Sequence, residues 1–462
     1  MPKQIRVNGF AIYSPVHLSP GLWTHPHDRS TEFNTLAYWQ EIACILERGK
    51  FDALFIADSL GIHDIYAGNA DAALRSAVQA PKHDPAMLVS ALASVTEHLG
   101  FGITSSTSYE PPFSLARRFS TLDHLTQGRI AWNIVTDYAT AAARAVGAGE
   151  VKAHDLRYDI ADEFLEATYK LWEGSWEDGA VLADKRTGEY VDPALVHRIE
   201  HRGEHFTVDA IHLVEPSPQR TPFLFQAGAS PRGRKFAAEH AEAVFLSDPS
   251  KAAVAESVAD IRARAKAAGR DPYDVLFYSL MTVIVALTEA EAQAKLADYR
   301  QYIDYRGTLA LFSGWTGIDL SKYDLDDPFP IVKKDNGITS AVDSFSRSGK
   351  VWTIREVVEH NAIGGRGPVV VGSPTQVADA LQAWGAETDV DGFNLSYAIT
   401  PGGFVDFVDL VAPELQRRGV YRTEYAKGTL REKAFGRGPT LPDTHIAARF
   451  RPKAKVAAEA PA

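Results

Sequence analysis

The stretch at residues 222–237, PFLFQAGASPRGRKFA, combines a strand pattern, a small-residue turn and a helix start. Pro222 to Gln226 is short and apolar, as in a buried strand, and Ala227-Gly228-Ala229 lets the backbone approach a ligand closely. Ser230-Pro231 suits the start of a helix, whose free N–H groups and dipole attract a phosphate. The stretch therefore predicts an anion site, although an ordinary strand-to-helix turn with a good cap explains the same residues.

Four more side chains add donors and charge to this predicted site. Arg232 and Arg234 follow the turn and add positive charge. His154 and Tyr158 are four residues apart at the start of another predicted helix, so they share a face and can both hydrogen-bond an anion there. The alternative is that Tyr158 is a core aromatic residue and His154 a solvated residue of the helix cap.

The elements that must position these residues alternate between strand and helix patterns. Gaps between the strands are filled by helical patterns such as 36–48, 86–98, 113–125, 252–268 and 404–418. Eight parallel strands with intervening helices are typical of a (β/α)₈ TIM barrel, an α/β fold whose chemistry collects at the C-terminal ends of the strands. An open doubly wound sheet is the alternative, but no GxGxxG motif follows the first strand. The eight predicted strands are Ile5–Tyr13, Phe51–Asp58, Leu99–Thr107, Ile130–Val135, Pro222–Gln226, Ala243–Leu246, Val275–Leu287 and Asp391–Leu395.

Polar side chains collect at the C-terminal ends of these predicted strands. The residues so placed are His17, Asp58, Thr104, Asn133, Gln226 and Ser230. We expect one barrel domain over residues 1–430 and a C-terminal extension over 431–462, with a disordered end from Arg451. Three long insertions, at about 59–85, 173–220 and 307–368, interrupt the alternation, and loops of such length are usually functional. The last two are candidates for a lid.

Composition excludes several classes of partner. The chain has 462 residues and a formal charge of −11 without a basic stripe, which argues against nucleic acid and anionic membranes as partners. The longest apolar run, 275–287, is too short to span a bilayer, and no signal peptide is evident, so we expect a soluble cytoplasmic protein. The single cysteine, Cys44, is expected in the core. His25-Pro26-His27-Asp28 has no partner at metal-ligand spacing, so no metal site is predicted.

Five segments carry a resemblance to a known family. They are ERGKFDALFIAD (47–58), RRFSTLDHLTQGRIAWNIVT (117–136), HDLRYDIADEFLEATYKLWEGSWED (154–178), EPSPQRTPFLFQAGASPRGRKFA (215–237) and VDGFNL (390–395). The chain resembles the bacterial-luciferase-like flavin monooxygenases over nearly its whole length. Within them it is similar to the branch of nitrilotriacetate, dibenzothiophene-sulfone, long-chain-alkane and dimethyl-sulfide monooxygenases.

The resemblance implies a two-component enzyme. A separate NAD(P)H:FMN reductase would supply FMNH₂, and one oxygen of O₂ would enter a small apolar or sulfur-containing substrate through a flavin peroxide. We also expect a homodimer or homotetramer. The implied FMN contacts are Asp58 and Thr104 near the ring system, Asn133 beside it, His154, Tyr158 and Ser230 at the phosphate, and Gln226, Ala227 and Gly228 along the cofactor.

This chemistry needs a water-poor pocket and groups that handle protons. His17 and His63 are our candidates, with Tyr138 as a weaker one, although a structural role is the simpler explanation for each. The branch varies at the positions of Ser14, His63, Tyr138 and Leu311, so the substrate stays open. Two alternatives remain: a non-flavin barrel enzyme that acts on a phosphorylated metabolite, and a binding protein that keeps the fold without the chemistry.

Overall fold

Eight parallel strands close into a barrel in the computed structural model, which describes residues 3–332, 337–347 and 349–452. Each strand pairs in parallel with its neighbours, and the β10–β11, β11–β13 and β13–β1 pairings close the ring. The prediction of a (β/α)₈ barrel is confirmed. The barrel strands are β1 (Arg6–Ile12), β2 (Ala53–Ala57), β3 (Gly100–Ser106), β4 (Ile130–Val135), β9 (Phe223–Gln226), β10 (Ala243–Leu246), β11 (Leu276–Val285) and β13 (Gly392–Ser396).

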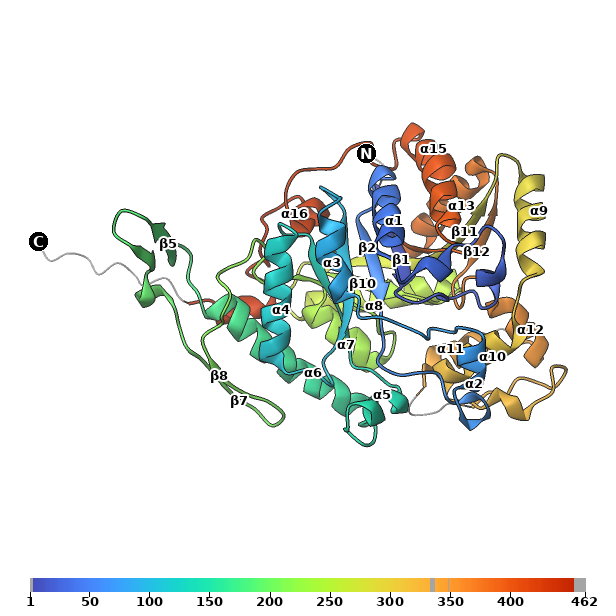
Figure 1. Cartoon of the computed structure of the whole chain (residues 1–462), viewed down its shortest axis with the longest axis horizontal. Coiled ribbons are helices and arrows are strands. Elements are labelled where there is room, and N and C mark those ends of the chain that lie inside the picture. Colours follow the sequence, from blue (N-terminus) through green and yellow to red (C-terminus); the bar gives the residue numbers. More distant parts are fainter. Residues whose placement is uncertain (1–2, 333–336, 348, 453–462) are drawn as a thin grey trace, which may run out of the picture.

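Helices cover the outside of the barrel (Figure 1). They are α1 (Leu36–Arg48), α3 (Ala86–Ala93), α4 (Pro112–Leu125), α6 (His154–Tyr169), α7 (Pro231–His240), α8 (Lys251–Ala267), α9 (Glu289–Arg300), α13 (Pro374–Thr388), α14 (Gly402–Asp406) and α15 (Ala412–Arg417). The helix predicted over 86–98 ends at Ala93. The helix predicted over 404–418 contains a π-helical segment at Phe407–Val411.

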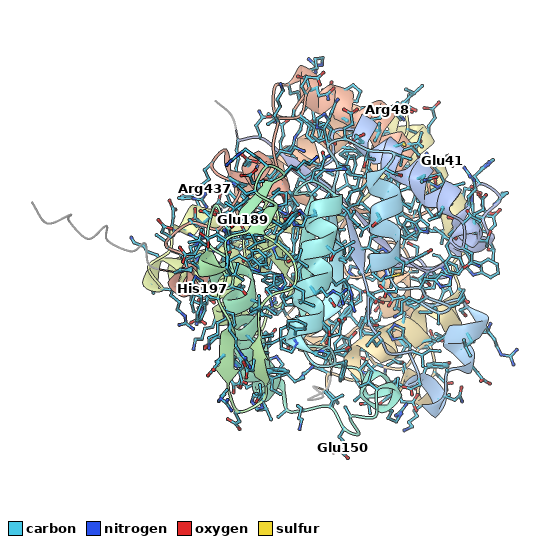
Figure 2. The ribbon with its side chains drawn as sticks, turned by 60° about the vertical axis from the view of Figure 1, so that its left-hand side comes forward. Glu41, Arg48, Glu150, Glu189, His197 and Arg437 are labelled. Carbon is cyan, nitrogen blue, oxygen red and sulfur yellow. The ribbon has the colours of Figure 1, made fainter. Side chains whose placement is uncertain are left out.

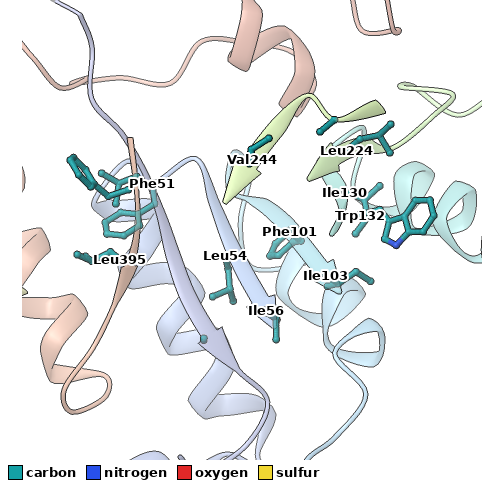
Figure 3. Packing of buried hydrophobic residues seen from close by; sticks show 14 of the residues in the cluster. Phe51, Leu54, Ile56, Phe101, Ile103, Ile130, Trp132, Leu224, Val244 and Leu395 are labelled. Carbon is teal, nitrogen blue, oxygen red and sulfur yellow. The ribbon is translucent and has the colours of Figure 1, made fainter. Parts of the chain in front are cut away.

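Side chains alternate between the two faces of each strand. In β2, Leu54 and Ile56 point out to the helices, where they pack with Phe101, Ile103 and Trp132 (Figure 3). The residue between them, Phe55, points into the barrel, and its ring meets that of Phe225 edge-on at 5.2 Å. The barrel interior is therefore a packed core, and the inward positions near the strand ends are free for chemistry.

One strand was missed by the sequence prediction. β12 (Val369–Gly372) lies outside the barrel and pairs with the outer end of β11, from Thr282 to Val285. In the sequence this run leads directly into the Ser373-Pro374 start of a helix. A short apolar run directly before a good helix cap does not reveal whether it has a strand partner.

The three insertions lie at two different ends of the barrel. Segment 59–85 contains α2 (Asp71–Arg75), and segment 307–368 lies largely in α10 (Tyr305–Thr316), α11 (Thr339–Ser346) and α12 (Ile354–Asn361). Segment 59–85 follows β2 and so belongs to the C-terminal face. Segment 307–368 comes after β11 and α9 and lies at the same face, because its α10 packs against α2.

The insertion at 173–220 follows α6 and precedes β9, which places it at the N-terminal face, so its prediction as a lid is wrong. It forms two ribbons, β5 (Val181–Asp184) with β6 (Glu189–Val191) and β7 (Ile199–Arg202) with β8 (Thr207–Ala210). Figure 1 shows these ribbons on the side of the barrel opposite α10–α12.

The C-terminal extension begins with α16 (Leu430–Phe435) and closes the N-terminal end of the barrel. Arg431 is fully buried, pairs with Glu242 at 2.6 Å, and donates to the carbonyl oxygens of Gln219 and Thr221. The domain boundary at residue 430 stays a prediction. The predicted disorder begins at Arg451, and residues 453–462 lie outside the described part of the chain.

Charged side chains of both signs cover the surface, with Glu41, Arg48, Glu189 and Arg437 among those labelled in Figure 2. Cys44 is exposed on α1, so its prediction as a core residue is wrong; it lies beside the buried stripe formed by Ile42, Ala43 and Ile45. In the described ranges no helix is long and apolar enough to cross a membrane.

Candidate active site

The residues predicted to form an anion site lie close together between α6 and α7, in an arrangement that we call the cradle. Ser230 caps α7, with its Oγ accepting from the Gly233 amide at 3.0 Å. A Cβ added at Gly228 would lie 2.6 Å from the Tyr158 hydroxyl oxygen, and one added at Gly233 would lie 2.7 Å from it. The Tyr158 hydroxyl therefore reaches the turn only because both positions are glycine, and it converges there with Ser230 and the side chain of Gln226.

The two arginines of the turn do not add free positive charge. Arg232 is paired with Asp159 and Asp162, and Arg234 lies 3.3 Å from both Glu256 and Asp260. That part of the prediction is wrong, because four carboxylates from α6 and α8 neutralise the guanidinium groups. An anion in the cradle would be held by the backbone N–H groups of the α7 start and by hydroxyl donors.

His154 lies beside this cradle at the start of α6. Its ring meets that of Tyr158 edge-on at 5.3 Å, and its Nδ1 lies 2.7 Å from the Asp155 carboxylate. The side chain is 40% exposed, so it can turn toward a ligand at the helix start. The structure thus brings His154, Tyr158 and Ser230 together, as the sequence predicts.

Two buried amide oxygens near the ends of β4 and β9 have no hydrogen-bond partner in the described residues. Asn133 donates from Nδ2 to Thr104 Oγ1 at 2.8 Å, and Thr104 in turn donates to the Ile56 carbonyl at 3.1 Å. This leaves Asn133 Oδ1 unpaired, and Gln226 Oε1 is unpaired as well. A buried polar atom without a partner costs about 1–3 kcal/mol, so both oxygens are suited to N–H donors of a ligand.

Asp58 follows β2 and forms a pair with Lys82 across the 59–85 insertion. Lys82 Nζ lies 3.8 Å from Asp58 Oδ1 and donates to Ser59 Oγ at 3.0 Å. Burial raises the pKa of Asp58 to about 6, against the opposing effect of Lys82, and burial also lowers the pKa of Lys82. Lys82 was missed because a lysine inside a long loop carries no signal of its partner.

His17 and His63 are linked through Gln79. The Gln79 amide donates to the His17 carbonyl oxygen at 3.1 Å, and its Oε1 lies 3.1 Å from His63 Nε2. Burial lowers the pKa of His17 to about 3 and that of His63 to about 4. Both imidazoles are neutral at neutral pH, so any role in the reaction is that of a neutral hydrogen-bonding group. Gln79 was also missed from sequence.

Tyr138 follows β4 at the C-terminal end of the barrel, which is the barrel mouth, and lies near Arg366. Burial raises its pKa, with Asp137 as a smaller contribution and Arg366 opposing it. Arg366 comes from the loop between α12 and β12 and donates to Ser340 Oγ of α11 at 2.8 Å. No pattern in the sequence links an arginine of that loop to Tyr138.

The lid is formed by the 59–85 and 307–368 insertions, which contact each other over the C-terminal face. The Ala67 amide donates to Asp319 Oδ1 at 2.9 Å, and a Cβ at Gly314 of α10 would fall 1.9 Å from His63 Nδ1. One hydrophobic cluster joins the barrel interior to α10, through Phe10, Phe55, Phe225, Leu311, Phe312 and Trp315. Ser14 and Leu311, at positions where the branch varies, are both buried.

The histidine–carboxylate groups that resemble metal sites already have partners within the protein. His25 Nε2 lies 2.8 Å from Asp298, and its ring packs against aromatic side chains. One group with metal-ligand spacing, Asp162, Glu239 and His240, lies on the outside of α6 and α7. There His240 is already bonded to Asp162 at 3.0 Å.

Comparison with known proteins identifies relatives that match nearly the whole length of the chain. The model of the luciferase-like monooxygenase family matches residues 10–391. The dimethyl-sulfide monooxygenase of Hyphomicrobium sulfonivorans is 47% identical over 454 residues, covering 98% of this chain and 94% of that protein. The long-chain alkane monooxygenase of Geobacillus thermodenitrificans is 48% identical over 452 residues, covering 98% and 99%.

A solved structure extends the likeness to a protein with bound flavin. The crystal structure of a riboflavin lyase with modified FMN and riboflavin superposes with a TM-score of 0.92 at 38% identity, covering 98% of this chain and 100% of that one. These findings confirm the predicted fold, the monooxygenase class and the flavin cofactor. They favour the flavin interpretation over a phosphorylated-metabolite enzyme. The chain belongs to the luciferase-like monooxygenase family.

Proposed function

We propose that this chain is the oxygenase of a two-component system that takes FMNH₂ from a separate NAD(P)H:FMN reductase. It transfers one oxygen atom of O₂ to a small apolar or sulfur-containing organic substrate. The observation that carries the proposal is the cradle of Tyr158, Ser230, Gly228 and Gly233, in which two glycines let the Tyr158 hydroxyl reach the Ser230 cap between two helix starts. Backbone N–H groups at helix starts attract an anion.

The residues near the ends of β4 and β9 fit FMN in one further way. The unpaired oxygens of Asn133 and Gln226 are acceptors for N–H groups, which a reduced flavin ring carries. In this assignment, Asp58, Thr104 and Asn133 contact the ring system and Gln226, Ala227 and Gly228 line the cofactor. The phosphate is held by His154, Tyr158 and Ser230.

When bound, reduced FMN supplies the electrons that activate O₂. The chain's own contribution is to exclude water and to hold protons in place. The cluster between the barrel interior and α10 excludes water from the mouth. His17, His63 and Tyr138 are neutral there, so they act as hydrogen-bond donors and acceptors at the reacting oxygen and not as charged acids.

The substrate class rests on the lining of the mouth and on the relatives. Two relatives are named for dimethyl sulfide and for long-chain alkanes, both without charge. The buried cluster that joins Phe10 and Phe55 of the barrel to Leu311 and Trp315 of α10 makes the surroundings of the strand ends apolar, which suits such molecules. We also propose a homodimer or homotetramer, which light scattering would measure.

Anaerobic titration with FMNH₂, followed by turnover with O₂ and a purified FMN reductase, tests the proposal. We expect saturable FMNH₂ binding, and oxygenated product from a sulfide or alkane only when the reductase is present. Binding of phosphorylated metabolites without FMNH₂ binding would support the alternative enzyme class instead. Product formation by the chain alone with NADH and FMN would contradict the two-component arrangement.

A further inference from the structure

Arg366 is a cation at the edge of the apolar barrel mouth. The neighbouring Gly365 lies against Leu18, which follows His17, and against Trp315 of α10: an added Cβ would meet them at 3.1 and 3.2 Å. The Arg366 guanidinium donates a hydrogen bond to Ser340 of α11 and acts electrostatically on Tyr138. Three elements of the mouth and lid therefore converge on Arg366.

This guanidinium has no carboxylate partner. Across residues 3–332, 337–347 and 349–452, no carboxylate oxygen lies within ion-pair distance of Arg366, and its Nη2 donates to the Ser340 hydroxyl at 2.8 Å. Asp248 acts on Arg366 at longer range, but its carboxylate is paired with Arg347 at 3.2 Å. Burial lowers the pKa of Arg366 to about 10, which leaves it charged at neutral pH.

Burying a charged arginine side chain costs free energy unless a partner of opposite charge compensates it. Arg232 and Arg234 each have two carboxylate partners. Arg157, which is buried beside Tyr158 on α6 with an unpaired Nε, lies on the cradle side of the site. A guanidinium offers a planar set of donors that matches a carboxylate or sulfonate. The phosphate cradle lies on α6 and α7, whereas Arg366 belongs to the lid, so the two can bind different anionic groups.

We propose that Arg366 recognises an anionic group, a carboxylate or sulfonate, at one end of an otherwise apolar substrate. The apolar body then lies against the aromatic lining of the mouth, and the Ser340 hydroxyl orients the guanidinium. This inference rests on the proposed function, since it names the substrate class of the same site. It also distinguishes the chain from a site built only for uncharged sulfides or alkanes.

Equilibrium binding separates this inference from the flavin assignment. Octanoate, 1-octanesulfonate and 1-octanol are titrated into the protein without flavin, using the wild type, Arg366→Met and Arg366→Lys. We expect the wild type to bind the two anions about 10- to 100-fold more tightly than the alcohol, as for hydrogen bonds to charged groups. Arg366→Met should lose that preference and Arg366→Lys should retain part of it.

The matched control is Arg355→Met, which removes a lid arginine that is paired with Asp326 on the surface. It should keep the preference for the anions, which excludes a general charge effect. Equal binding of octanoate and octanol by the wild type, or an unchanged preference in Arg366→Met, overturns the inference. FMNH₂ titration of the same variants reports on the proposed function separately. If Arg366→Met weakens FMNH₂ binding while the preference for anions persists, Arg366 belongs to the flavin site and the inference is wrong.

Discussion

Replacing Gly233 by alanine should separate the stability of the protein from its affinity for flavin. Gly233 lies in the first turn of α7, and a Cβ there would lie 2.7 Å from the Tyr158 hydroxyl oxygen. Ordinary contacts begin near 3.4 Å, so the hydroxyl must retreat by about 0.7 Å. The ring cannot turn freely, because it packs against Phe236 at 5.5 Å and under the Arg232 guanidinium.

The size of the effect follows from the hydrogen bond that is lost. A hydrogen bond to a charged phosphate contributes about 1.5–3 kcal/mol, so Gly233→Ala should weaken FMNH₂ binding by about 10- to 150-fold. The same change replaces a glycine inside a helix by alanine, and this replacement by itself stabilises a helix by about 0.5–1 kcal/mol. We therefore expect unchanged or slightly raised thermal stability together with weaker flavin binding.

Anaerobic FMNH₂ titration and thermal unfolding measure the two quantities on one protein sample. Gly385→Ala is the matched control, because a Cβ at that position in α13 meets only a carbonyl oxygen, at 3.9 Å. It should gain stability without any change in FMNH₂ affinity. Wild-type affinity in Gly233→Ala would refute the placement of the phosphate beside Tyr158.

Three further predictions address the donors, the imidazoles and Asp58. Ser230→Ala and Tyr158→Phe should each weaken FMNH₂ binding, measured by the same titration, and unchanged affinity in both would remove the cradle assignment. His17→Ala and His63→Ala should keep FMNH₂ affinity but lower the ratio of product to H₂O₂; a wild-type ratio with a lower melting temperature would show that they only pack the core. The pKa of Asp58 is raised to about 6 in the folded protein, so folding is favoured at low pH and this contribution is lost as the pH rises from about 4 to 6. Relative to Asp58→Asn, the wild type should lose up to about 3 kcal/mol of unfolding free energy between pH 4 and pH 7, and denaturant unfolding that shows the opposite slope would contradict the assignment.

The sequence predicted the barrel because its pattern repeats. Each strand is bounded by turns and alternates with a helix, so the eight parallel strands and their ends could be placed. Residues that directly follow a strand or begin a helix could therefore be brought together in advance, as with Tyr158 and Ser230. β12 was missed because its partner, the outer end of β11, lies far away in the chain.

What the sequence could not supply was the set of partners across long loops. The pairing of Asp58 with Lys82, and the bridge of Gln79 between His17 and His63, depend on how the 59–85 insertion folds back. The sequence also could not show which charged side chains are paired. Two arginines after a predicted phosphate turn indicated free positive charge, but carboxylates from neighbouring helices neutralise them in the fold.

The charges that remain near the mouth restrict what it can bind. The two histidines are neutral, Asp58 is balanced by Lys82, and the turn arginines are paired, so the aromatic centre of the mouth carries little net charge. Attraction for anions comes from the helix starts at the cradle, with Arg157 of α6 beside them, and from Arg366 on the lid. This distribution of charge fits ligands that place one anionic group at the cradle and another at Arg366, with uncharged groups between the two. FMN bound through its phosphate at the cradle and an apolar substrate whose anionic group reaches the lid are such ligands.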